Sequence, residues 1–316
     1  MDHFFETRFS EMKSDGVSDV GVKRAETFIH DGEKFLETYT ITETFFEKSV
    51  QKARSFVEDE LDVENLDTKV FIVPEERRKD FLQQWRQLGF IAGDNDNGFY
   101  EPLVNSVVVY HQPERFHEVT FEATLVHELA HATSKKRLRL TESNNHTLVH
   151  TDRIGFALIA SNFGYFLEEG LAGSLQAKYL QLNGSEDQEF WEDFMNSLRT
   201  VTKLVDEQRP FNTVLQIGDL KIPASYSIFD RNDTPPLLTT PYLLFGAAFD
   251  LLCQQIPSFR ETAINARKDH KSISALAQMI NNQFGKGSYV YLQKKGYYNG
   301  PTDALETYKY ILERTK

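Results

Sequence analysis

The chain has 316 residues, of which 40% are hydrophobic and 26% charged, as is usual for a soluble globular protein, and its formal net charge is −12. This acidic balance argues against nucleic acid and anionic membranes as partners, because both are bound through basic patches. Cys253 is the only cysteine, so an intramolecular disulfide is excluded. Residues 1–6 lack a basic segment followed by an apolar run, and no apolar stretch is long enough to span a bilayer. We therefore expect a cytoplasmic protein.

The first half of the chain combines helices with short strands. Hydrophobic spacing predicts amphipathic helices over residues 1–60, which we expect to form an extension packed on the core. Residues 69–74, 97–100 and 105–110 are predicted strands, and the last is apolar and β-branched enough to be buried. The polar stretch 139–150 is predicted as a loop, with a short hairpin formed by 147–150 and 154–159.

The second half is predicted to be mainly helical. Residues 166–180 repeat leucine and tyrosine every four positions, which predicts a buried helical stripe. From about residue 187 the chain is expected to be mostly helical, with helices at 242–256, 259–267, 273–284 and 302–313. These patterns suggest a central core over 61–180 and a helical lobe over 181–316.

The run His127-Glu128-Leu129-Ala130-His131 is the most informative segment of the sequence. On a helix, residues four apart lie one above the other, so His127 and His131 can reach one zinc ion at about 2.0–2.1 Å. Glu128 lies one step around the helix, where it can act on a zinc-bound water as a general base without being a ligand.

The surroundings of this pentad favour a buried helix. Phe121, Leu125, Leu129 and Ala132 follow one another at helical spacing. The alternative is a solvated helix that carries two histidines by chance, since such a short pattern also occurs without a metal.

A catalytic zinc site usually takes three protein ligands and keeps one position for water. The predicted helix at 166–180 offers two adjacent carboxylates, Glu168 and Glu169. Periodicity does not choose between them, although Glu168 falls nearer the Leu171 and Leu175 face. Either residue could instead be a solvated first-turn glutamate that is stabilised by the helix dipole.

The pentad together with Glu169-Gly170-Leu171-Ala172 resembles the gluzincin metallopeptidases, the superfamily of thermolysin and the aminopeptidase-N-like enzymes. The resemblance selects Glu169, and it implies one Zn²⁺ per chain held by His127, His131 and Glu169. It also implies an α+β zincin-like fold, in which a small mixed sheet and the active-site helix are joined to a mostly helical C-terminal lobe that closes the cleft.

Two further segments are similar to the same superfamily. Residues 97–100 look like its edge strand, which pairs with an extended peptide substrate; the alternative is an ordinary edge strand. Residues 239–246 resemble a Pro-Tyr-x-x-Gly segment with one extra residue before the glycine. That resemblance makes Tyr242 a donor to the oxyanion, while the alternative is a core tyrosine at a helix start.

The sequence also departs from the superfamily. Gly173 and Ser174 stand where thermolysin-like enzymes have an aspartate after the third ligand, so the partners of the two histidines stay unassigned. A Gly-x-Met-Glu-Asn motif is missing, which disfavours an aminopeptidase that anchors a free amine.

We therefore expect a zinc-dependent peptidase that acts on a peptide or protein. The main alternative is a non-catalytic binding or regulatory protein of zincin fold with a vestigial metal site. A third interpretation is a hydrolase of a non-peptide substrate, such as a small epoxide or amide, at the same site.

Overall fold

The chain forms two compact units, Met1–Ser161 and Asn162–Lys316. The computed structural model describes residues 8–9, 11–14, 16–40, 44–92, 97–111, 118–144, 146–161, 163–184, 213–217, 220–224, 240–269, 272–295 and 301–315. Helices and small mixed sheets together confirm the α+β class. The boundary between the units falls inside the segment 61–180 that was expected to be one core. Among the described helices, none combines the length and apolar character needed to traverse a bilayer.

A three-stranded mixed sheet lies at the centre of the first unit. Its strands are β2 (Lys69–Pro74), β3 (Gly98–Glu101) and β4 (Ser106–His111), in the order β2-β4-β3. Strand β2 runs parallel to β4, and β3 runs antiparallel to it. All three predicted strands are confirmed, and β3 is an edge strand of this sheet as described.

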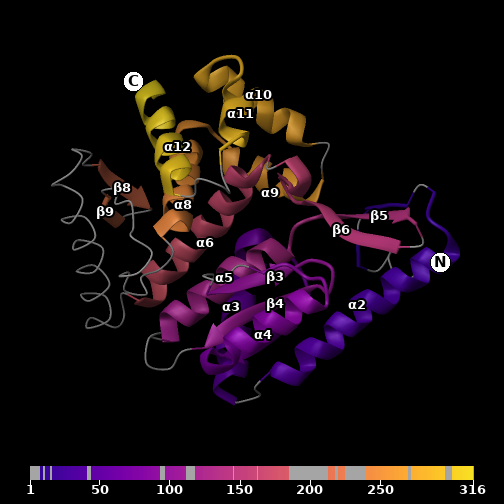
Figure 1. The fold of residues 1–316 in the computed structure, drawn as a ribbon. Helices are drawn as coiled ribbons and strands as arrows, with labels where there is room; N and C mark the ends of the chain where they lie inside the picture. Colours follow the sequence, from indigo (N-terminus) through magenta and orange to yellow (C-terminus); the bar gives the residue numbers. More distant parts are fainter. Residues whose placement is uncertain are drawn as a thin grey trace. The chain divides into compact units, whose positions relative to one another are not determined.

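Helices cover both faces of this sheet (Figure 1). Helices α2 (Asp19–Tyr39), α4 (Glu75–Gln87) and α5 (Glu118–Ala132) contact the strands, and the helix between α2 and β2 is α3 (Thr44–Leu61). Alternate strand residues such as Phe71 and Tyr110 share one hydrophobic core with Ile29 of α2 and Trp85 of α4. Helix α5 packs on β3 and β4, and α3 packs on α5. Side chains alternate between the two faces of a strand, which allows one short sheet to serve both layers.

A second sheet of the first unit corrects the predicted loop over 139–150. Its strands are β1 (Glu11–Lys13), β5 (Lys136–Ser143), β6 (His146–Ile154) and β7 (Ala157–Leu158), in that order across the sheet, followed by the 3₁₀ turn η1 (Ile159–Ser161). Strands β5 and β6 form an antiparallel hairpin. Buried Leu138 and Leu140 alternate with partly exposed Arg137 and Arg139, which is a strand pattern hidden by its many polar residues.

The second unit is mainly helical, as expected. Its described helices are α6 (Tyr165–Gly184), α8 (Thr240–Gln255), α9 (Phe259–Lys268), α10 (Ile273–Phe284), α11 (Ser288–Gln293) and α12 (Pro301–Arg314). They confirm the five helices predicted in this part of the chain. The antiparallel pair β8 (Thr213–Ile217) and β9 (Leu220–Ala224) was not predicted. Each of these strands is only five residues long, too short to stand out in a region that otherwise has helical periodicity.

Helices α6 and α8 approach each other at glycines. A Cβ atom on Gly246 of α8 would lie only 2.6 Å from the carbonyl carbon of Gly173 and from the backbone nitrogen of Ser174. A Cβ on Gly170 would lie 3.2 Å from the carbonyl oxygen of Phe245. Real Cβ atoms do not approach backbone atoms as closely as 2.6 Å. Gly246, part of the segment that suggested an oxyanion donor, therefore also has a packing role.

Cys253 lies on α8 and is partly buried. Burial raises the pKa of its thiol to about 12. The thiol therefore stays protonated at neutral pH, as is typical of a small packing residue rather than a reactive or metal-binding group.

The turn between β3 and β4 is organised around Asn105, which has a positive φ of 47°. Its Oδ1 atom accepts hydrogen bonds from the Tyr100 hydroxyl at 2.9 Å and from the Lys136 ammonium at 2.8 Å. Thr68, just before β2, donates to the same oxygen at 3.3 Å. One side chain thus ties the edge strand to the segment that follows α5.

Glu101, at the end of β3, is buried, and its Oε1 accepts the backbone N–H of Leu103 at 3.0 Å. Burial raises its pKa from 4.5 to about 7, although the hydrogen bond opposes this shift. The folded state then binds the proton more tightly than the unfolded state. The stability contributed by the proton is complete below pH 4.5 and is lost as the pH rises through 7.

We expect Glu101→Gln to remove this pH dependence, because the amide keeps an acceptor for Leu103 but does not ionise. The free energy of unfolding of the variant minus that of the wild type should be up to about 3 kcal/mol larger at pH 8 than at pH 4. Urea unfolding of both proteins at the two pH values measures this gain. An equal difference at pH 4 and pH 8 would contradict the assignment.

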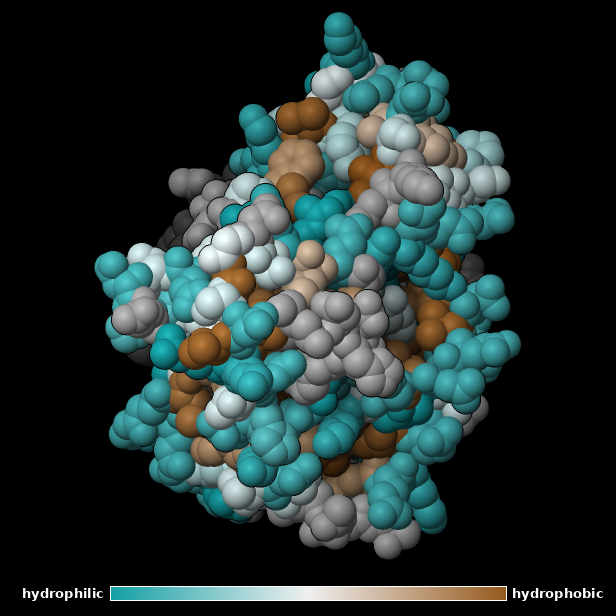
Figure 2. Space-filling view, turned by 90° about the vertical axis from the view of Figure 1, so that its right-hand side faces the viewer, coloured by the Kyte–Doolittle hydropathy of each residue, from teal (hydrophilic) through white to brown (hydrophobic). Residues whose placement is uncertain are grey.

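The face drawn in Figure 2 is mainly hydrophilic, and the hydrophobic residues on it form small separate patches. Exposed large hydrophobic residues occur along the described chain, among them Val20, Ile91, Leu148, Leu182 and Val290. Scattered apolar residues of this kind are normal on protein surfaces and do not by themselves indicate an interface.

Candidate metal centre

Helix α5 carries the two histidines of the pentad. Nearly all of its residues are buried, including Leu125 and Leu129, as the predicted apolar stripe requires. His127 is 4% exposed and His131 8% exposed. Buried imidazole nitrogens need hydrogen-bond partners or a metal ion, so the groups around the two histidines indicate their role.

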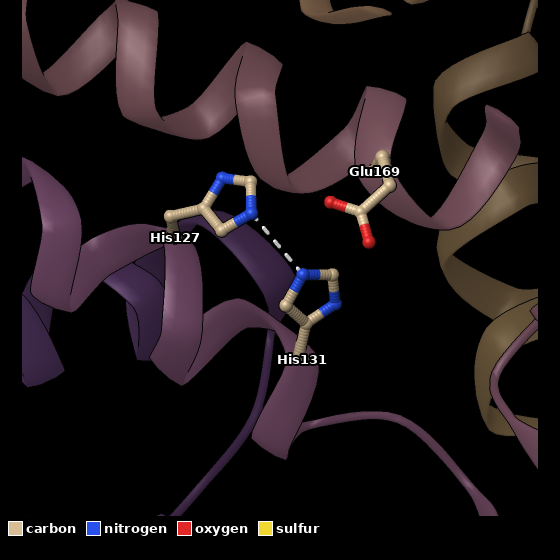
Figure 3. A group of neighbouring side chains, drawn as sticks. All are labelled: His127, His131 and Glu169. Carbon is tan, nitrogen blue, oxygen red and sulfur yellow. Dashed lines mark hydrogen bonds between the residues drawn. The ribbon is translucent and has the colours of Figure 1, made fainter. Parts of the chain in front are cut away.

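The two imidazoles point their Nε2 atoms at each other, 3.2 Å apart, with the ring planes at 77° (Figure 3). Two nitrogens bound to one tetrahedral zinc at about 2.0–2.1 Å would lie roughly 3.3–3.4 Å apart. The observed separation is therefore close to the separation that a shared ion requires.

Glu169 on α6 completes the predicted set. One ligand atom from each of His127, His131 and Glu169 lies within 4.8 Å of the other two. In Figure 3 the carboxylate of Glu169 points toward the two rings. Two imidazole nitrogens and one carboxylate oxygen are a donor set that suits zinc, and a fourth position would remain for water. The residues present therefore fit the metal that the sequence predicted.

Glu168, the alternative ligand, has a different role. Both its side chain and that of Arg267 on α9 are 2% exposed, and they form an ion pair. The Arg267 Nε atom donates to the two carboxylate oxygens at 3.1 and 3.2 Å, and Nη2 donates at 2.5 Å. Glu168 thus faces α9, while the neighbouring Glu169 takes part in the histidine cluster.

Glu128, the predicted general base, lies on α5 between the two histidines and is partly exposed. Solvent access at this position fits a group that exchanges protons. Tyr242 falls in the first turn of α8. Its side chain lies outside the described residues, so its role as an oxyanion donor stays a prediction.

No pattern in the sequence indicated the residues that hold α6. Besides Arg267, a second polar group joins α6 to α8 and α9. The Ser174 hydroxyl donates to Asp250 at 2.6 Å, and the Arg260 guanidinium donates to Ser174 at 2.5 Å and to Asp250 at 2.8 Å. Burial raises the pKa of Asp250, although Arg260 and Ser174 oppose the shift. The contacts that involve α6 join residues 76 to 99 positions apart, and no local pattern marks such pairs.

Comparison of the chain with protein-family models, curated proteins and solved structures found no match. The resemblance to gluzincins therefore stays a prediction that rests on the residues and their geometry.

Proposed function

We propose that this protein is a zinc-dependent peptidase of the gluzincin type, with a zincin-like fold. One observation carries the proposal: the ligand atoms of His127, His131 and Glu169 gather within 4.8 Å of one another. His131 and Glu169 lie 38 positions apart in the sequence, and they were paired there through the resemblance to gluzincins. Such a cluster of the predicted residues supports the metal site more strongly than the pentad does.

The proposed chemistry assigns a proton-transfer role to Glu128. Bound zinc would lower the pKa of a coordinated water toward about 7 and polarise the peptide carbonyl. Glu128 accepts a proton from the attacking water and then delivers it to the leaving nitrogen. His127, His131 and Glu169 would hold the metal. Tyr242 is proposed to donate a hydrogen bond to the developing oxyanion.

The substrate is proposed to bind as an extended peptide along β3. Within the described sheet this strand pairs with β4 on one side and leaves its other side at the sheet edge. Backbone pairing at an edge gives affinity with little sequence selectivity. Gly98 lies beside Thr124 of α5, because a Cβ at Gly98 would come within 3.4 Å of the Thr124 methyl group. Thr124 is one turn before Glu128, so β3 runs next to the helix that carries the proposed base.

Metal analysis of the purified protein tests the proposal first. We expect zinc near one equivalent per chain. A peptide library incubated with the protein should be cleaved, and a chelator should abolish the cleavage until zinc is restored. Zinc binding without cleavage of any peptide would favour the non-catalytic protein or the non-peptide hydrolase. Absence of zinc after reconstitution would reject the metal site.

A further inference from the structure

The buried Glu168–Arg267 pair lies directly beside the proposed ligand Glu169. Replacing a buried ion pair with apolar residues of similar volume often leaves stability unchanged or raises it, because desolvation offsets the attraction. Stability alone therefore gives little reason for this pair. A planar guanidinium that contacts both carboxylate oxygens does provide one thing that apolar packing lacks, which is a fixed geometry.

The geometry that the pair fixes is the rotation of α6 about its axis. Consecutive residues of an α-helix point about 100° apart, so the direction of Glu168 determines the direction of Glu169. Glu168 lies in the first turn of α6, where helices fray most easily. A restraint at this position acts on the turn that also presents the ligand.

Helix α9 holds α6 at two points. Arg267, near the end of α9, contacts Glu168, and Arg260, near its start, contacts Ser174. The two arginines are seven residues apart, about 10 Å along α9, and their partners are six residues apart, about 9 Å along α6. The two contacts run in opposite order along the helices: the start of α9 reaches the later residue of α6, and the end of α9 reaches the earlier one.

We infer that Arg267 is a positioning residue for the metal site: it orients Glu168 and thereby directs the Glu169 carboxylate toward zinc. This inference rests on the proposed function, because it assumes that Glu169 is a ligand. In this inference Arg267 acts through Glu168 and is not itself a ligand. Losing it should weaken zinc binding by loosening the direction of Glu169.

The test is the zinc dissociation constant, measured by competition with a chromophoric chelator on metal-free protein. Arg267→Lys keeps the charge but loses the two-oxygen contact. The double variant Glu168→Met/Arg267→Met replaces the pair with apolar side chains and leaves no buried charge unpaired. We expect zinc affinity to fall about 10- to 100-fold in each, as is typical when a group that orients a ligand is lost.

Arg260→Met provides a matched control. It removes an arginine from the same helix and breaks contacts to the same α6, but at Ser174, more than one turn away from Glu169. It should lower the melting temperature of the metal-free protein, since Asp250 loses its cationic partner, while the zinc affinity stays within about threefold of wild type. A role of Arg267 in stability alone would give the Arg267 variants this same behaviour.

The outcomes distinguish failure of the positioning role from failure of the metal site. If wild type binds zinc and both pair variants, shown to be folded by circular dichroism, bind it within threefold of wild type, the positioning role is rejected and the metal site stands. If neither pair variant folds, the pair serves stability and the positioning role is likewise rejected. If wild type binds no zinc, the proposed function itself fails.

Discussion

Glu128→Gln is expected to lower chelator-sensitive peptide hydrolysis by about 10²- to 10⁴-fold, the usual contribution of a general base. The amide has nearly the same shape as the carboxylate but does not accept a proton from water. Glu128 is not among the residues of the metal cluster, so the variant should still bind one equivalent of zinc. Initial rates on a cleaved library peptide, measured with zinc-loaded protein, give the comparison.

The control for this variant is its metal content, because loss of zinc would also abolish hydrolysis. Glu128→Asp provides a second comparison, since it keeps an ionisable group but withdraws it by one methylene. It should retain more activity than the glutamine variant. Undiminished hydrolysis by Glu128→Gln with zinc bound would show that another group serves as the base.

Glu169→Ala is expected to weaken zinc binding by at least about 10²-fold, because removal of a ligand should cost no less than removal of a group that merely orients one. Hydrolysis should fall with the zinc occupancy. The same chelator competition measures the affinity, and activity at saturating zinc shows how much function the two histidines support alone.

Glu128→Gln is the matched control here as well. Both variants remove one carboxylate charge near the histidines, Glu128→Gln on α5 and Glu169→Ala on α6. Glu128→Gln should nevertheless leave zinc in place. Full zinc content in Glu169→Ala would exclude this residue as a ligand. Because Glu168 forms a buried ion pair with Arg267, such a result would indicate that the third ligand is neither Glu168 nor Glu169.

Local sequence patterns were sufficient for the half of the site that lies on α5. The spacing of His127 and His131 places them on one face of a helix, and their Nε2 atoms do lie 3.2 Å apart. Periodicity was not sufficient for the third residue. It placed Glu168 nearer the buried face, which is correct, but that burial serves the ion pair with Arg267. The choice of Glu169 came from the resemblance to gluzincins, because the contact of Glu168 with α9 depends on tertiary structure.

The fold shows the same division between local and long-range information. Apolar strands such as β4 were predicted correctly, since burial on both faces leaves a continuous hydrophobic run. The β5–β6 hairpin was mistaken for a loop because the outward positions of β5 carry polar residues, Arg139, Thr141 and Ser143. The alternation of Leu138 and Leu140 with polar residues was the signal that could have indicated a strand there. Glycines such as Gly246 acquire their meaning only from the helix packed against them.

The protonated state of the Cys253 thiol has a practical consequence for spectroscopy. A thiol with a pKa of about 12 reacts slowly with maleimides near pH 7, where alkylation proceeds through the thiolate. A cysteine introduced at an exposed site, for example in place of Leu148 or Val290, would react first. A variant with one such introduced cysteine can therefore carry a single fluorescent or spin label while Cys253 is kept.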